Sequence, residues 1–267
     1  MSAPEFLRSA WDFHPSVVAG CLALLAAYVC LAPARSRARA AAWLGGVLLI
    51  ALALMSPLDE LADRYLFSVH MAKHIILVLA APALLLIGLP AQPFERLLRY
   101  RSAARLERFL DTPVIAWLAG VGAMAFWHVP AVFNAALAYE PLHIVEHLSL
   151  LVGGTIYWWP VLSPLARSRL HPVPQAAAYL LSSCMGCTAI GVLITFSGKL
   201  LYPAYIHPVD AFGILPMIRR QWGISPALDQ QIGGLLMWVP GCLVYLTAIM
   251  AMFARWYGEE HEVAVEA

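Results

Sequence analysis

Long apolar segments separated by short polar ones run the length of the chain. A helix needs roughly 20 apolar residues to cross the hydrocarbon core of a bilayer, whereas a barrel strand is shorter and alternates apolar with polar residues. These segments are long and continuously apolar, so they predict helices, which satisfy their own backbone hydrogen bonds in lipid. We expect one transmembrane domain over residues 1–267, an all-α bundle of seven spans at about 16–32, 40–57, 66–89, 113–130, 142–162, 174–196 and 230–254.

The composition changes this picture only by excluding two classes of protein. Hydrophobic residues make up 61% of the chain and charged residues only 12%. Soluble domains carry about 25% charged residues, so this chain lacks the polar surface of a soluble enzyme. The net charge of +1 provides no basic field for nucleic acid, whose binding depends on clustered Lys and Arg. The expected surroundings are membrane lipid.

The basic residues predict an orientation, because short cytoplasmic loops are enriched in Lys and Arg. Lys73 lies within the third span, and a minority of the 17 basic residues lie in the even-numbered connections or before the first span. The others follow the first, third, fifth and seventh spans: Arg35, Arg37, Arg39, Arg96, Arg99, Arg101, Arg105, Arg108, Arg167, Arg169 and Arg255. We therefore expect the N-terminus outside and the C-terminus in the cytoplasm, which agrees with an odd number of spans.

The outer connection 197–229 is unusually long for a loop between two spans. Long loops are more often functional than idle. Tyr202, Tyr205 and Trp222 indicate that it lies along the membrane interface, where amphipathic rings gather.

Histidines are concentrated on the predicted outer side. Of the nine, all except His171 and His261 fall at outer span ends or in the outer loop. Interfaces tolerate histidine, so this distribution alone does not require a site. Spacing within the spans is more informative than the number of rings.

Two histidine pairs have the same spacing and the same predicted depth. His70 and His74 are four residues apart in the third span, and so are His143 and His147 in the fifth, which places each pair on one helical face. Both spans run from outside to inside, so the four imidazoles can converge. Imidazole suits copper, zinc, iron or nickel. One pair alone is explained equally well by histidines bonded to interfacial water, but two matching pairs favour a site for one or two metal ions.

Each pair also contains one charged residue, Lys73 in the first and Glu146 in the second. Isolated charges in a membrane bundle are costly, so such residues usually pair or face water. We expect a Lys73 to Glu146 ion pair that links the two spans and orients the imidazoles. The alternative is that each side chain extends separately to the outer interface.

Weaker candidates lie on other spans. Met124 and His128 are four residues apart on the fourth span, and a thioether beside an imidazole suits cuprous copper, although Met more often packs in a core. Cys184 and Cys187 could pass a soft ion through the sixth span, but buried Cys usually packs as a small apolar group. Asp229, at the start of the seventh span, is expected to be a helix N-cap rather than a ligand.

Four segments resemble one known family. They are 70–90 (HMAKHIILVLAAPALLLIGLP), 127–130 (WHVP), the HIVEHLSLLVGGTIYWWP motif within 142–160, and 229–241 (DQQIGGLLMWVPG). Together they are similar to the multi-span CtaG family of cytochrome c oxidase assembly factors, which serve caa-type oxidases. The similarity runs from about residue 56 to residue 240 and is spread over four spans, which makes it more specific than any single motif.

The resemblance implies a multi-pass protein of the bacterial inner membrane that matures haem-copper oxidases and is suspected of supplying copper. The matching positions are His70, His74, His128, His143 and His147. The two pairs would then hold copper near the extracytoplasmic face, with His128 as a fifth ligand. An extracytoplasmic donor would supply the ion, and ligand exchange, without catalysis, would pass it to an oxidase subunit. Zinc and iron remain open as the bound ion, and the oligomeric state stays open too.

Other classes of protein remain open. A membrane di-iron oxidase also uses histidine-rich helices, but no HxxHH box is present. His143, Glu146 and His147 match the HxxEH signature of inverted zinc proteases, in which the Glu is a general base, yet the second histidine pair is then unexplained. A copper transporter would need polar ligands across the whole bilayer. A bis-histidine haem protein would need opposed rather than adjacent rings.

Overall fold

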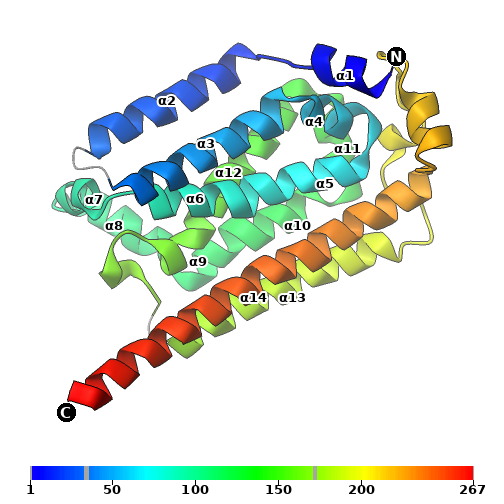
Figure 1. The fold of residues 1–267 in the computed structure, drawn as a ribbon. Helices are drawn as coiled ribbons and strands as arrows, with labels where there is room; N and C mark the ends of the chain where they lie inside the picture. Colours follow the sequence, from blue (N-terminus) through cyan, green and yellow to red (C-terminus); the bar gives the residue numbers. More distant parts are fainter. Residues whose placement is uncertain (1, 33–35, 171–172, 267) are drawn as a thin grey trace.

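The computed structural model describes residues 2–32, 36–170 and 173–266, and its described residues form helices and no strands (Figure 1). Arg35 and His171, used above for orientation and histidine placement, lie outside the described residues. The elements are α1 (Ala3–Ser9), α2 (Pro15–Leu31), α3 (Arg37–Met55), α4 (Pro57–Glu60), η1 (Leu61–Tyr65), α5 (Phe67–Ile75), η2 (Ile76–Ala80), α6 (Ala81–Gly88), α7 (Ala91–Leu97), α8 (Arg101–Leu110), α9 (Pro113–Trp117), η3 (Leu118–Gly122), α10 (Ala123–Trp127), α11 (Pro130–Ala138), α12 (Glu140–Leu162), η4 (Ala166–Ser168), α13 (Val173–Thr195), η5 (Pro203–Tyr205), η6 (Met217–Gln221) and α14 (Pro226–Glu266).

Several helices are long and apolar enough to cross a membrane, so the predicted all-α membrane class is confirmed at that level. Four candidates among the described residues meet both conditions: Arg37–Met55, Phe67–Gly88, Val173–Thr195 and Pro226–Gly258. A fifth arises if Arg101–Leu110 and Pro113–Trp127, which are bent by 66° at their junction, form one span. Helix α2 is shorter than these candidates. Helix α12, which carries His143, Glu146 and His147, is not among the candidates.

Helix α12 lies at the centre of the bundle because two adjacent glycines let it approach its neighbours. A Cβ atom at Gly153 would overlap the carbonyl of Ala119 in η3, and one at Gly154 would overlap the carbonyl of Val78 in η2. Only glycine permits such a close backbone approach. The contact fixes α12 against the π-helical turn that directly follows α5, so the two helices that carry the histidine pairs are held side by side.

The two ends of the bundle differ in character. Helix α1 and the loop before α14 lie together at one end, whereas α7 and the C-terminal end of α14 lie at the opposite end (Figure 1). The loop packs onto the first of these ends: Ile214 and Ile218 form a buried cluster with Phe6 of α1. Tyr202 and Tyr205, predicted to lie at the membrane interface, are instead buried, whereas Trp222 is exposed.

Asp229 fixes the start of α5 from a neighbouring helix. Its carboxylate accepts hydrogen bonds from the backbone N–H groups of Phe67 and Ser68, at 2.8 and 3.0 Å. Asp229 was expected to cap its own helix, but it caps the start of α5 instead. The start of α14 is capped by Ser225, whose hydroxyl accepts a hydrogen bond from the N–H of Leu228. Since α5 carries His70 and His74, this contact positions the first histidine pair.

Candidate metal centre

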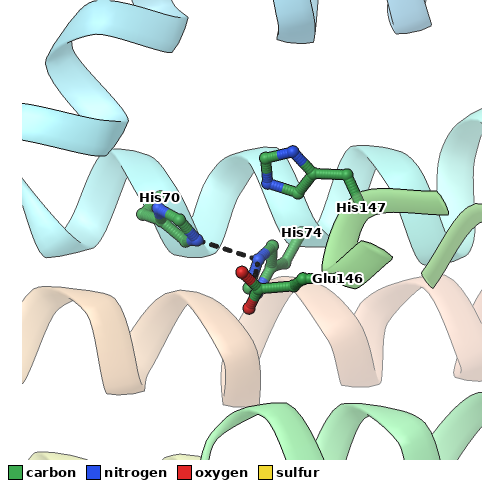
Figure 2. Close-up of side chains that lie close together, drawn as sticks. All are labelled: His70, His74, Glu146 and His147. Atoms are coloured by element: carbon green, nitrogen blue, oxygen red, sulfur yellow. Dashed lines mark hydrogen bonds and ion pairs between the residues drawn. The ribbon is translucent and has the colours of Figure 1, made fainter. Parts of the chain in front are cut away.

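Four buried residues direct ligand atoms at one another (Figure 2). His70 and His74 come from α5, Glu146 and His147 come from α12, and one ligand atom of each lies within 4.8 Å of the others. Nε2 of His70 lies 2.9 Å from Nε2 of His74, and Nε2 of His74 lies 3.4 Å from Oε1 of Glu146. We call these four residues the inner group. The i, i+4 spacing thus places both helices' rings where the sequence predicted them to converge.

The fourth predicted imidazole, His143, belongs to a neighbouring set. Its Nε2 lies 3.5 Å from Oδ1 of Asp63 and 4.0 Å from Oε2 of Glu146. The same Asp63 oxygen lies 3.2 Å from Nδ1 of His70. Asp63, His70 and His143 therefore form a second possible ligand set, which we call the outer group. His70 belongs to both groups through its two ring nitrogens.

The contacts of His128 set the protonation of the neighbouring ring. Its Nδ1 lies 2.6 Å from the carbonyl oxygen of Met124, which can only accept, so this nitrogen carries the proton. Nε2 of the neutral ring is then an acceptor, 3.4 Å from Nδ1 of His74. His74 donates through Nδ1, which leaves the lone pair on its Nε2. That lone pair is directed at His70 and Glu146.

His128 therefore contacts the inner group without belonging to it. Its Nε2 also lies 3.0 Å from the sulfur of Met71, whereas Met124 contributes its backbone carbonyl. The expected Met124 and His128 pair is thus replaced by Met71 and His128, because α5 lies against the end of α10. The structure places the predicted fifth ligand where it orients His74.

Several polar atoms in the two groups lack hydrogen-bond partners. Among the described residues, these include both carboxylate oxygens of Glu146, Nε2 of His147, Nε2 of His143 and Nδ1 of His70. A buried polar atom left unpaired costs about 1–3 kcal/mol, so native structures rarely accumulate several at one place. A cation held in either group would satisfy the unpaired atoms of that group together. Imidazole nitrogens with a carboxylate oxygen form a donor set that fits copper, zinc or iron.

The predicted ion pair between Lys73 and Glu146 is wrong. The ammonium of Lys73 is 2.9 Å from Asp59 and also bonds to Asp63, and its side chain is 1% exposed. The prediction paired Lys73 with Glu146 because the two residues occupy equivalent positions in the histidine pairs. It missed that α4 and η1 fold beside α5 and bring Asp59 and Asp63 to Lys73. Glu146 is thereby left free of a lysine partner and faces the imidazoles.

These two carboxyl groups precede the third span and differ in acidity. Burial raises the pKa of Asp59 to about 6, although Lys73 opposes the rise. Burial also acts to raise the pKa of Asp63, but Lys73 and His70 outweigh it and hold that pKa well below its ordinary value. Asp63 is therefore an anion beside the histidines. The signal that could have found it is the acidic segment 59–63 just before His70.

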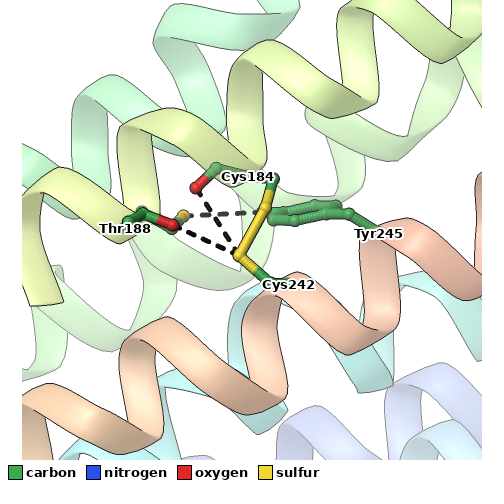
Figure 3. Close-up of a disulfide and its surroundings, with 5 residues drawn as sticks. Cys184, Thr188, Cys242 and Tyr245 are labelled. Atoms are coloured by element: carbon green, nitrogen blue, oxygen red, sulfur yellow. Dashed lines mark hydrogen bonds between the residues drawn. A yellow bond between two sulfur atoms is a disulfide. The ribbon is translucent and has the colours of Figure 1, made fainter.

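The two cysteines of α13 have different roles, and no disulfide was predicted for Cys184 (Figure 3). Cys184 of α13 forms a disulfide with Cys242 of α14, so it does not pair with Cys187 as a ligand for a soft ion. Cys187 is a buried free thiol, 3.7 Å from the hydroxyl of Tyr245. The disulfide links two helices that lie side by side along most of their length (Figure 1).

One family profile and several curated relatives match this chain. The profile described as cytochrome c oxidase caa3 assembly factor matches residues 22–259. An uncharacterized protein of Mycobacterium leprae is 26% identical over 256 residues, covering 85% of this chain and 35% of the relative. An uncharacterized protein of Mycobacterium tuberculosis is 23% identical over 214 residues, covering 74% of this chain and 31% of the relative. This chain thus spans about a third of the length of these curated relatives. No solved structure matches the chain significantly.

Proposed function

The chain belongs to the family of cytochrome c oxidase caa3 assembly factors, and from this premise we propose that it binds copper in its paired histidines and delivers the ion to an oxidase subunit. The family supports a role in oxidase assembly, and the apolar helices fit a membrane protein. One observation carries the copper proposal. Two buried imidazole nitrogens lie 2.9 Å apart beside the unpaired oxygens of Glu146 and the unpaired Nε2 of His147.

The short contact between the two imidazoles supports a bound cation. Nε2 of His74 holds a lone pair, so its contact with Nε2 of His70 needs either a proton or a cation between the two nitrogens. A shared proton would satisfy these two atoms but leave Glu146 and His147 unpaired. A metal ion would satisfy all four residues of the inner group. Copper heads the affinity order of divalent ions at such sites, and partner and location must supply selectivity.

The proposed arrangement in the membrane retains seven spans, with the N-terminus outside and the C-terminus in the cytoplasm. It adds α2 and α12 to the candidates recognised by length and hydropathy. The arginines of α7 and α8 support this orientation, because they lie at the bundle end opposite to α1. The inner group then lies near the extracytoplasmic face. An extracytoplasmic donor can reach it there, and an oxidase subunit can dock beside it.

Delivery needs ligand exchange and no catalysis by this chain. Copper would be held by His70, His74, Glu146 and His147, then taken over by the ligands of the oxidase subunit. The burial of Glu146 supports this role over that of the general base in an HxxEH protease. Its side chain is 0% exposed and both oxygens lie within 4.0 Å of histidine nitrogens. Such a carboxylate is placed to bind a cation rather than to activate substrate water.

Copper retention by purified protein tests the binding step. Equilibrium dialysis against buffered copper is expected to load wild type and His207→Ala equally, because His207 is exposed and lies outside both groups. His74→Ala is expected to lose at least about tenfold in affinity, since it removes the ligand between His70 and Glu146. Equal retention by His74→Ala would reject the site.

Oxidase maturation in cells tests the delivery step. A strain lacking this protein is expected to assemble copper-deficient oxidase when copper is limiting. Wild type and His207→Ala would restore oxidase activity and His74→Ala would not. Normal oxidase activity in the deletion strain under limiting copper would reject the assembly role.

A further inference from the structure

A cavity of about 970 Å³ separates α2 from α12 and reaches both ligand groups. Helix α2 lies at the edge of the bundle beside α3 (Figure 1). Gly20 and Leu24 line the cavity on the α2 side, and Leu148 lines it on the α12 side. Asp63, His143 and His147 line its polar part. A space of this size is far larger than an ion, so it provides a route to the histidines.

Charge in the lining favours a positive occupant. Among the described residues that line the cavity, the carboxylates outnumber the lysines and arginines, of which Arg64 is one, and they are Asp12, Asp59, Glu60, Asp63 and Glu140. A cleft lined by one sign of charge raises the local concentration of ions of the opposite sign. The cavity therefore concentrates cations next to Asp63.

The two ligand groups differ in their access to this cavity. Asp63 and His143 line it, with side chains 24% and 15% exposed, whereas the side chains of His70, His74 and Glu146 are 0% exposed. His70 joins the groups, because its Nδ1 faces Asp63 and its Nε2 faces His74. Of the inner group, His147 also lines the cavity but is only 9% exposed, so an ion from the cavity meets Asp63 and His143 before it can reach His74 and Glu146.

We propose that Asp63, His143 and Nδ1 of His70 form a second, transient cation site through which copper passes from the cavity to the inner group. The proposal rests on the copper-binding function proposed above and adds a route and an order of binding to it. Neutral His70 has one lone pair, so it serves one group at a time. When copper is bound to one ring nitrogen of His70, the ring proton resides on the other nitrogen. One chain accordingly holds one copper ion at His70 rather than two.

The transfer consists of ligand exchange at constant oxidation state. Bonds from copper to Asp63 and His143 replace those to the ligand that brought the ion. Bonds to Nε2 of His70, His74, Glu146 and His147 then replace the bonds to Nδ1 of His70, Asp63 and His143. In the same step Nε2 of His70 releases its proton and Nδ1 takes one up from cavity water beside Asp63, so the ring stays neutral. Lys73 explains why the first site is transient: its ammonium bonds to Asp63 and repels a cation held there. Asp59 keeps a partner available to Lys73 while Asp63 binds the ion.

Loading kinetics distinguish a route through the outer group from direct access to the inner group. Purified wild-type protein in detergent is mixed with the cupric complex of a weak coloured chelator such as murexide, whose absorbance falls as the chelator loses copper. The rate of this fall reports loading, and its end point reports affinity. Wild type is expected to load in a single phase that ends at one copper ion per chain.

Two variants perturb the route at different places. Gly20→Phe is expected to slow loading about tenfold or more with an unchanged end point, since a Cβ at Gly20 meets no atom within 4 Å and the ring extends into the cavity. Ala19→Phe, at the adjacent exposed residue outside the lining, is the matched control and is expected to load like wild type. His143→Gln is expected to slow loading by a larger factor than it weakens retention.

The possible failures are distinguishable. If wild type takes no copper from the chelator at equilibrium, the proposed function fails. If wild type retains copper but Gly20→Phe and His143→Gln load at the wild-type rate, the second site and its route are overturned while the inner group stands. Two copper ions per chain with both groups occupied would also overturn the transfer order.

Discussion

Replacing Lys73 with Met is expected to destabilise the protein far more than removing an exposed cation. The ammonium is 1% exposed and bonds to Asp59 and Asp63, whose side chains are 23% and 24% exposed. Met has a similar length, so the change removes the charge and leaves the packing nearly intact. The same region offers a matched pair, Arg64 with Glu60, in which the arginine is 51% exposed.

The expected loss of stability in each variant follows from how deeply the ion pair that it breaks is buried. Removing one partner of a buried pair costs about 3–5 kcal/mol, because the remaining charge is left uncompensated. The partial exposure of both carboxylates places Lys73→Met near the lower limit, about 3 kcal/mol. Exposed pairs contribute about 0.2–1 kcal/mol, so Arg64→Met is expected to fall in that range. The pKa of Asp63 lies well below its ordinary value. The stabilisation from the ion pair of Lys73 with Asp63 is therefore present above about pH 4 and is lost only as the pH falls through the lowered pKa of Asp63.

The assay is reversible unfolding in mixed detergent micelles at pH 7, followed by circular dichroism. Wild type, Lys73→Met and Arg64→Met are compared, together with Lys73→Met/Asp63→Asn. The double variant is expected to recover part of the loss, because it removes the carboxylate left without its cation. If Lys73→Met lies within about 1 kcal/mol of Arg64→Met, the buried ion pair does not exist as described.

Two further predictions concern packing and pH. Gly154→Ala is expected to cost about 1–3 kcal/mol, because its Cβ would overlap the backbone of Val78, whereas Gly122→Ala has room and is expected to be neutral or stabilising. Unfolding in micelles checks both, and equal stabilities would contradict the close contact of α12. Burial and Glu107 raise the pKa of Asp111 to about 7. Its carboxyl therefore destabilises the folded protein increasingly as the pH rises from about 4 to 7, and the effect is constant above. The Tm of Asp111→Asn is expected to exceed that of wild type at pH 8 and to equal it near pH 4, and a difference independent of pH would contradict the burial of Asp111.

The parts predictable from sequence are those set by local spacing. Continuous apolar segments predicted the helices, because a chain in lipid must satisfy its backbone groups internally. The i, i+4 spacing predicted that each histidine pair shares a face, and the structure brings His70, His74 and His147 together. The place of Glu146 among them was visible in the motif but was assigned to the wrong partner.

The parts that sequence could not supply depend on contacts between distant segments. Lys73 pairs with Asp59 and Asp63 because α4 and η1 fold back beside α5, and no spacing rule states that fold. The disulfide joins Cys184 to Cys242 across 58 residues, a pairing that no local spacing indicates. The capping of α5 by Asp229 likewise joins residues more than 160 positions apart.

The central claim is that copper binds to imidazoles and a carboxylate in the inner group. X-ray absorption spectroscopy of purified, copper-loaded protein tests it most directly, because nitrogen or oxygen ligands and sulfur ligands scatter differently. The account predicts nitrogen and oxygen neighbours with the outer-shell scattering of imidazole rings, reduced in His74→Ala. Sulfur in the first coordination shell, from Met71 or a cysteine, would contradict it, as would imidazole scattering that His74→Ala leaves unchanged.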